Sequence, residues 1–175
     1  MALPPQRVED EVVNMYVIRE RLFRMGEDSD ITDEAGQPVF RVDGKVLSLS
    51  NRLILLDPAG REVGQVHRKL VALRPAYEIT IDGKDVAEVR KHLFSGFGER
   101  FTIEVRGAGD MEIDGDIFGH EFTIGRTGQV VATISKRWLT VTASYAVDIA
   151  PGEDDVLILA SVLALDLAID AEHEH

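Results

Sequence analysis

The sequence predicts a mainly β domain: a closed antiparallel barrel of about twelve strands around a buried, hydrophobic C-terminal α-helix. Two observations lead to this fold. Between residues 14 and 150, short stretches of alternating apolar and polar residues recur at regular intervals and are separated by turn residues. After residue 150 the alternation stops, and a run begins that is apolar on every side, as is typical of a helix surrounded by protein.

The strands are predicted from a period of two. In Tyr77–Ile81 and Phe101–Val105, apolar residues alternate with polar ones, which indicates strands with one buried and one solvated face. Asp43-Gly44, Asp82-Gly83 and Asp114-Gly115 are pairs that favour tight hairpins. The predicted strands lie near residues 15–19, 30–33, 38–42, 46–49, 52–57, 62–69, 76–81, 85–93, 100–106, 111–117, 121–124 and 129–135, with a further run at 145–149.

The C-terminal run predicts a helix at about residues 153–170. Acidic residues in Glu153–Asp155 suit the first turn of a helix, and Val156–Ile169 is apolar apart from Ser161 and Asp166. This run is shorter than the roughly 20 apolar residues that a membrane-spanning helix needs. A barrel of about twelve strands is wide enough to enclose one helix. We therefore expect one domain over residues 14–170, a loose N-terminal arm at 1–13 and a frayed tail at 171–175.

Composition narrows the function. The formal net charge is -12, which argues against a nucleic-acid partner. From Asp148 onward the chain holds only acidic charges, so the preceding domain is closer to neutral and can carry a local basic patch. The chain has no cysteine, which excludes disulfides and cysteine nucleophiles and fits a reducing compartment. We expect a cytoplasmic protein with no signal peptide and with peripheral membrane contact at most.

Several segments, in order, resemble the LURP-one-related family. The segment Arg68–Ile79 resembles the family's motif of basic residues, leucine, arginine and tyrosine, and Glu121–Ile124 followed by Val131–Trp138 resembles its later hairpin. Tyr145–Val147 and the acidic start of the apolar helix resemble its C-terminal signature. The family is grouped with Tubby C-terminal domains and phospholipid scramblases, so the resemblance implies an antiparallel barrel around a central helix. It does not imply scramblase activity, because this chain lacks the cysteines that are palmitoylated in scramblases.

Tubby domains bind phosphoinositide headgroups through a basic patch, so the resemblance implies an anionic ligand. Headgroup phosphates are recognised by converging arginine forks and lysine point charges. The candidate residues for such a site are Arg68, Lys69, Arg74, Lys136 and Arg137.

Other constellations predict little. The sequence carries no nucleophile elbow, P-loop or zinc-protease motif, so we expect no enzyme activity, no catalytic residues, no metal and no cofactor. The acidic segment Glu27–Glu34 lacks the glycine and the final glutamate of a calcium loop. Asp114 and Asp116, with His120 and Glu121, can gather on a hairpin as metal ligands or form an ordinary polar turn.

One further pair concerns the barrel interior. Lys136 shares the strand phase of Ile134, and a charge on the inner face needs a partner. Asp166, the charge within the apolar helix, is one such partner; otherwise Lys136 extends to solvent at the rim.

These observations leave three hypotheses for function. The first is a non-catalytic binding or scaffolding domain for an anionic lipid or a phosphorylated small molecule. The second is a protein-interaction module with no small ligand. The third is an enzyme of unknown type that uses Lys136 and a carboxylate at the rim.

Overall fold

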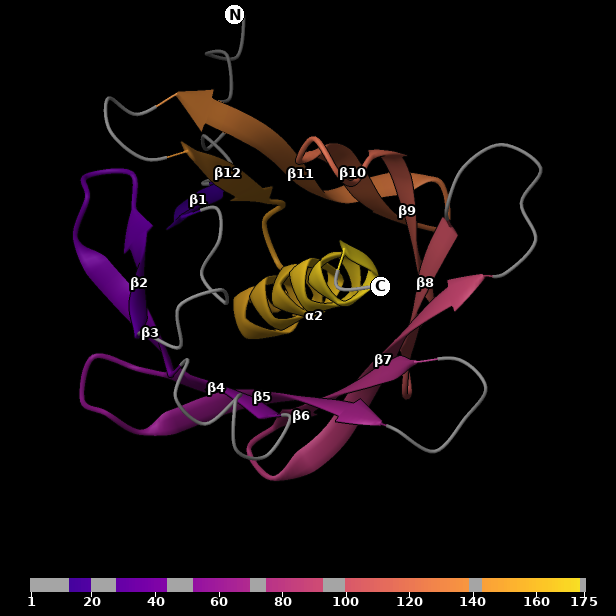
Figure 1. Ribbon diagram of the computed structural model, residues 1–175, viewed down its shortest axis with the longest axis horizontal. Helices are drawn as coiled ribbons and strands as arrows, with labels where there is room; N and C mark the ends of the chain where they lie inside the picture. Colours follow the sequence, from indigo (N-terminus) through magenta and orange to yellow (C-terminus); the bar gives the residue numbers. More distant parts are fainter. Residues whose placement is uncertain are drawn as a thin grey trace, which may run out of the picture.

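A computed structural model describes residues 13–19, 28–43, 52–69, 75–92, 100–138 and 143–173. Twelve antiparallel strands form one closed barrel, in which each strand pairs with its neighbours in sequence and β1 pairs with β12 (Figure 1). The first six strands are β1 Asn14–Arg19, β2 Ser29–Asp33, β3 Pro38–Asp43, β4 Arg52–Leu56, β5 Glu62–Lys69 and β6 Ala76–Ile81. The other six are β7 Lys84–His92, β8 Arg100–Val105, β9 Met111–Asp116, β10 Glu121–Arg126, β11 Gln129–Trp138 and β12 Ala143–Ile149.

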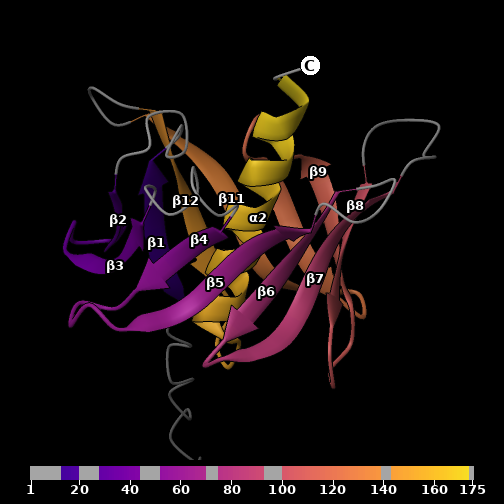
Figure 2. The ribbon, with the colours of Figure 1, turned by 60° about the horizontal axis from the view of Figure 1, so that its bottom comes forward.

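The helix α2, Asp155–His173, runs through the middle of this barrel (Figures 1 and 2). Every residue from Ile158 to Leu165 is at most 1% exposed, so about two full turns are enclosed on all sides. The predicted mainly β barrel around a hydrophobic helix is confirmed. The helix continues to His173 rather than ending near residue 170, and the candidate strand at 46–49 lies outside the described residues, as does most of the predicted N-terminal arm.

The two ends of the barrel differ in their connections. At one end, which we name the base, tight turns join the strands, and three of them contain Gly36, Gly83 and Gly128 in the left-handed conformation. The helix begins here, where the Asp154 side chain accepts a hydrogen bond from the backbone N–H of Leu157 and caps the first turn. The opposite end, which we name the mouth, contains the C-terminal ends of the odd-numbered strands and the C-terminal end of the helix (Figure 2).

Polar contacts fix the start of the helix at the base. The Tyr16 hydroxyl donates a hydrogen bond to Asp155 at 2.5 Å, and the Asn14 amide donates to the same carboxylate oxygen at 2.8 Å. Burial, followed by the hydrogen bond and the negative charge of Asp155, raises the pKa of Tyr16, so its hydroxyl stays a donor. On the other side, Arg126 holds Glu153 with contacts of 3.0 and 2.9 Å.

The opposite wall of the barrel meets the helix through apolar contact. Helix α2 contacts β5, β6 and β7, and a side chain at Gly64 of β5 would meet Val156 at 3.0 Å. The glycine therefore allows the first turn of the helix to lie close to the barrel wall. The core consists of inward-facing strand residues together with nearly the whole helix surface, which is why the apolar run needs no polar face.

Candidate functional site

The predicted basic residues that the structure describes lie on both sides of the barrel wall. Arg68 follows Val66 in phase and lies on the inner side of β5, whereas Lys69 lies on the outer wall. Lys136 has the predicted inward phase of Ile134 in β11. Arg74 and the side chain of Arg137 lie outside the described part of the structure.

Lys69 is neutralised by carboxylates rather than available to a ligand. Its Nζ lies 2.6 Å from a carboxylate oxygen of Glu78 and 2.9 Å from one of Glu88, on the two strands that follow β5. Hydrogen bonds to Glu78 and then to Glu88 raise the pKa of Lys69. Arg90 extends this outer ion-pair network, since its Nε lies 2.5 Å from Glu88. Lys69 is therefore best explained as a structural residue of the outer wall.

The network gives a testable stability prediction at Glu88, which is 9% exposed. Burial acts to raise the pKa of Glu88, but hydrogen bonds from Lys69 and Arg90 outweigh it and hold the pKa below its ordinary value of 4.5. A carboxyl group whose pKa is lowered by folding stabilises the folded state at pH values above its ordinary pKa. This stabilisation is lost as the pH falls through the folded-state pKa. We expect Glu88→Gln to lower the free energy of unfolding at pH 7 by about 1–2 kcal/mol.

Urea unfolding of both proteins from pH 7 to pH 3 would check this prediction. The stability difference between Glu88→Gln and the parent should narrow below pH 4.5. Glu104→Gln is the control, because Glu104 is half exposed and lies at 3.4 Å from Arg90. A difference that stays constant over this pH range would show that the charge of Glu88 contributes nothing.

At the mouth, the inner side of β5 and β6 holds two polar groups in a buried setting. Arg68 and Tyr77 are directly opposite each other in the strand register. Tyr77 is 2% exposed, and its hydroxyl has no hydrogen-bond partner among the described residues; the same is true of the buried Nε of Arg68. Burial raises the pKa of Tyr77, opposed by the positive charge of Arg68 and reinforced by the negative charge of Asp170. The phenol is therefore a neutral donor.

A second polar group holds the helix to the opposite wall of the mouth. Asp166 of α2 accepts a short hydrogen bond from the hydroxyl of Tyr145 in β12, and it lies 3.1 Å from Nε2 of His120. The imidazole stacks on the Tyr145 ring, with a centroid separation of 4.2 Å and an interplanar angle of 12°. We name these three residues the Asp166 cluster. The sequence suggested Asp166 as the partner of Lys136, but the contacts of Asp166 are with His120 and Tyr145.

The turn between β9 and β10 delivers His120 to this position. His120 has φ of +54°, a left-handed conformation that costs energy in residues other than glycine. Gly115, with φ of +121°, allows the hairpin to close, because a side chain there would lie 2.6 Å from the carbonyl oxygen of Glu121. The sequence left His120 either as a metal ligand or in an ordinary polar turn, and this contact was missed because nothing in the local pattern shows that the turn faces inward.

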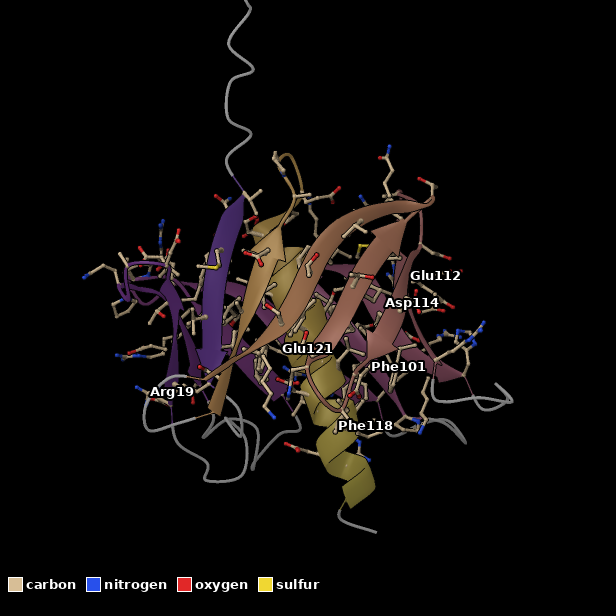
Figure 3. All side chains as sticks on the ribbon, turned by 90° about the horizontal axis from the view of Figure 1, so that it is seen from above. Arg19, Phe101, Glu112, Asp114, Phe118 and Glu121 are labelled. Carbon is tan, nitrogen blue, oxygen red and sulfur yellow. The ribbon has the colours of Figure 1, made fainter. Side chains whose placement is uncertain are left out.

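The residues considered as metal ligands do not come together in the described structure. Glu112, Asp114 and Glu121 are exposed on the barrel wall formed by β9 and β10 (Figure 3). The imidazole of His120 instead contacts Asp166 of the helix. Among the described residues, no three carboxylate or imidazole side chains gather as a metal site. In the calcium-like segment, Ser29–Asp33 form the strand β2 instead of a loop.

Within the described ranges, α2 and any other helical stretch fall short of the length and apolarity required to cross a membrane.

Comparison with known proteins decides the family. The LURP-one-related family model matches residues 14–166, which is most of the chain. The chain belongs to the LURP-one-related family. This LURP-one-related domain is 33% identical over 153 residues to the uncharacterized protein YxjI of Bacillus subtilis strain 168, covering 87% of this chain and 91% of YxjI. Its fold is similar to the X-ray structure of a protein from Arabidopsis thaliana, with a TM-score of 0.66, 17% identity and coverage of 90% and 91% of the two chains.

Proposed function

We propose that this LURP-one-related domain is a non-catalytic binding module that holds a small anionic group at the mouth of its barrel, with Arg68 as the cation. The observation that carries this proposal is the pairing of Arg68 with Tyr77. Both lie on the inner side of the mouth, and each has a buried donor atom with no hydrogen-bond partner among the described residues.

Such donors are rare in folded proteins because they are costly. A buried polar atom without a hydrogen bond loses its hydration and gains nothing in return, at about 1–3 kcal/mol per group and more for a charged one. Two orphaned donors on directly opposed residues are best explained by an acceptor that enters from outside. Since one of the two is a guanidinium, an anion is the favoured acceptor.

The other predicted basic residues support this site unequally. Lys136 has the inward phase and its strand ends at the mouth, so it belongs to the same region. Lys69 is removed from the proposed site, because two carboxylates already hold it on the outer wall. The source of the anion is proposed to be a lipid headgroup or a free small molecule in the cytoplasm, and any membrane contact would be peripheral. A protein partner that presents an acidic group is the alternative.

The test replaces Arg68 and measures anion binding. Binding of acetate and of inorganic phosphate is measured by titration calorimetry at constant ionic strength. We expect the parent to bind these anions at least about tenfold more tightly than Arg68→Gln does. Vesicles of phosphatidylcholine with and without phosphoinositide test the lipid source. The control is Arg41→Gln, because Arg41 is an exposed arginine paired with Asp30 on the outer wall.

The control matters because exposed cationic side chains also attract anions weakly. Binding of equal strength in the parent, Arg41→Gln and Arg68→Gln would reflect that general effect. If Arg68→Gln binds both anions as tightly as Arg41→Gln does, the proposed site is wrong.

A further inference from the structure

The outer wall of the barrel holds a further buried donor near the mouth. Ser144 precedes Tyr145 in β12, and it has the outward phase because the Tyr145 hydroxyl reaches Asp166 of the enclosed helix. Ser144 is 2% exposed, and its hydroxyl makes no hydrogen bond with any described residue. A buried hydroxyl in this state has lost its hydration without compensation, which folded proteins avoid. An acceptor from outside the chain would satisfy it.

The residue directly opposite Ser144 in β1 is Arg19. Its side chain is exposed at the mouth end of the strand (Figure 3), and it makes no hydrogen bond or ion pair with a described residue. The chain as a whole has 31 acidic against 19 basic side chains. Five other described arginines each contact a carboxylate, at distances from 2.5 to 3.8 Å. The cation of Arg19 is therefore available to a ligand.

The separation of two strands explains why Arg19 has no carboxylate beside it. Toward the mouth, β1 and β2 pair no further than Val17 with Thr32. If this register continued, Asp30 of β2 would lie opposite Arg19. Asp30 instead contacts Arg41 of β3 at 3.5 Å, which compensates its charge. The described neighbours of Arg19 thus offer it an unsatisfied hydroxyl on one side and no unpaired acid on the other.

The other exposed arginines without a described carboxylate do not face an unsatisfied donor. Arg52 lies opposite His67. Arg100 lies opposite His92, whose ring is hydrogen-bonded to Thr102. Within the described part of the outer wall, the combination of an available guanidinium and an unsatisfied buried hydroxyl is therefore specific to β1 and β12.

These two groups together suit a tetrahedral oxyanion. A guanidinium fork holds two oxygen atoms of one acceptor group. The Ser144 hydroxyl turns about a single bond, so it can donate to a third oxygen held beside the fork. A carboxylate has no third oxygen, whereas a phosphate monoester has three terminal oxygens and about two negative charges at neutral pH. The donors at Arg19 and Ser144 therefore favour a phosphate monoester.

We propose that Arg19 and Ser144 form a second anion site, on the outer wall, that binds a phosphate monoester carried by a soluble molecule. The site lies on the other side of the wall from the Arg68–Tyr77 pair, so it does not rest on the proposed function. A soluble source is favoured over a lipid because the net charge of -12 opposes docking on an anionic membrane.

The test titrates isotope-labelled Arg68→Gln protein with phenyl phosphate at about pH 7.5 and follows the backbone amides by NMR. Arg68→Gln removes the cation of the proposed mouth site, so failure of this test leaves the proposed function intact. We expect saturable shifts at the amides of Arg19 and Ser144. Benzoate lacks the third oxygen and should bind at least about threefold more weakly. Absence of saturable shifts at these amides, or equal affinity for benzoate, would overturn the proposal.

A matched pair of arginine variants tests the cation in the same background. Arg19→Gln should weaken phenyl phosphate binding at least about tenfold, because the guanidinium supplies the charge and two of the three donors. Arg100→Gln is the control, since it removes another exposed arginine that has no described carboxylate. Equal losses in the two variants would mean that surface charge in general attracts the phosphate, which contradicts a site at Arg19.

Ser144→Ala separates binding from stability. Removal of an unsatisfied buried hydroxyl should leave the melting temperature without ligand unchanged or higher, because no hydrogen bond is lost. The same change should weaken phenyl phosphate binding at least about threefold, since the third donor is missing. A lower melting temperature would show that the hydroxyl has a structural role, and an unchanged affinity would show that it does not touch the ligand; either result removes Ser144 from the site.

Vesicles test the source of the phosphate. Phosphatidylcholine vesicles that contain phosphatidate should sediment no more of the Arg68→Gln protein than pure phosphatidylcholine vesicles do. Additional sedimentation that is lost in Arg19→Gln would assign the phosphate monoester to a lipid and overturn the soluble source.

Discussion

Replacing Leu159 with aspartate is expected to unfold the whole domain in a single cooperative transition. Leu159 is 0% exposed and lies in the stretch of α2 that the barrel surrounds on every side. A carboxylate there has no route to water and no cation within the apolar core, and burying it costs more than about 5 kcal/mol. Because that is comparable to the whole stability of a typical domain, we expect loss of structure by circular dichroism at 25 °C.

A milder change keeps this prediction measurable if the aspartate variant does not accumulate. Leu159→Ala should fold, and it should lose about 2–5 kcal/mol in urea unfolding because the enclosed site cannot collapse around the missing atoms. Val130→Asp is the control, since Val130 is 55% exposed at the start of β11 and should change stability by less than about 1 kcal/mol. Similar losses for Leu159→Ala and Val130→Asp would mean that the helix is not enclosed.

Much of the fold could be predicted because its causes are local. The period of two in Phe101–Val105 exists because one face of β8 packs on the helix and the other meets water. The uniform apolarity of α2 exists because the barrel leaves it no solvated side. Each pattern is written within a single element, so it can be read without knowing which elements are neighbours.

The site could be predicted only in part, because it depends on register and on turn direction. Arg68 and Lys69 are adjacent in sequence, yet the pleat puts them on opposite sides of the wall. The neutralisation of Lys69 requires Glu78 and Glu88 from two further strands, whose alignment the sequence does not display. The sequence offered Asp166 as a partner for Lys136, whereas its contacts with Tyr145 and His120 depend on which strand ends face the last turns of the helix.

The second large effect is expected at Asp166, whose carboxylate joins the helix to β12 and to the β9–β10 turn. Asp166→Asn removes the charge that His120 and the Tyr145 hydroxyl both approach, in a setting where the side chain is 14% exposed. Losing one member of a mostly buried charged group costs about 3–5 kcal/mol at most, and the retained amide oxygen should reduce the loss to about 2–4 kcal/mol. Urea unfolding of the parent and of Asp166→Asn at pH 7 measures this loss in the free energy of unfolding.

A double-mutant cycle with Tyr145→Phe assigns this loss to the contact itself. Because both single changes break the same hydrogen bond, the double variant should be about 1–2 kcal/mol more stable than the sum of the two losses predicts. The matched pair is Tyr16 with Asp155, which makes the equivalent tyrosine–aspartate contact at the base. Combining Tyr16→Phe with Asp166→Asn should give additive losses, because the two contacts lie at opposite ends of the helix. If the losses are additive in the Tyr145 cycle as well, Asp166 is held by something other than Tyr145. If only the Tyr145 cycle shows coupling, the helix is fixed at its two ends by independent contacts to the adjacent strands β1 and β12.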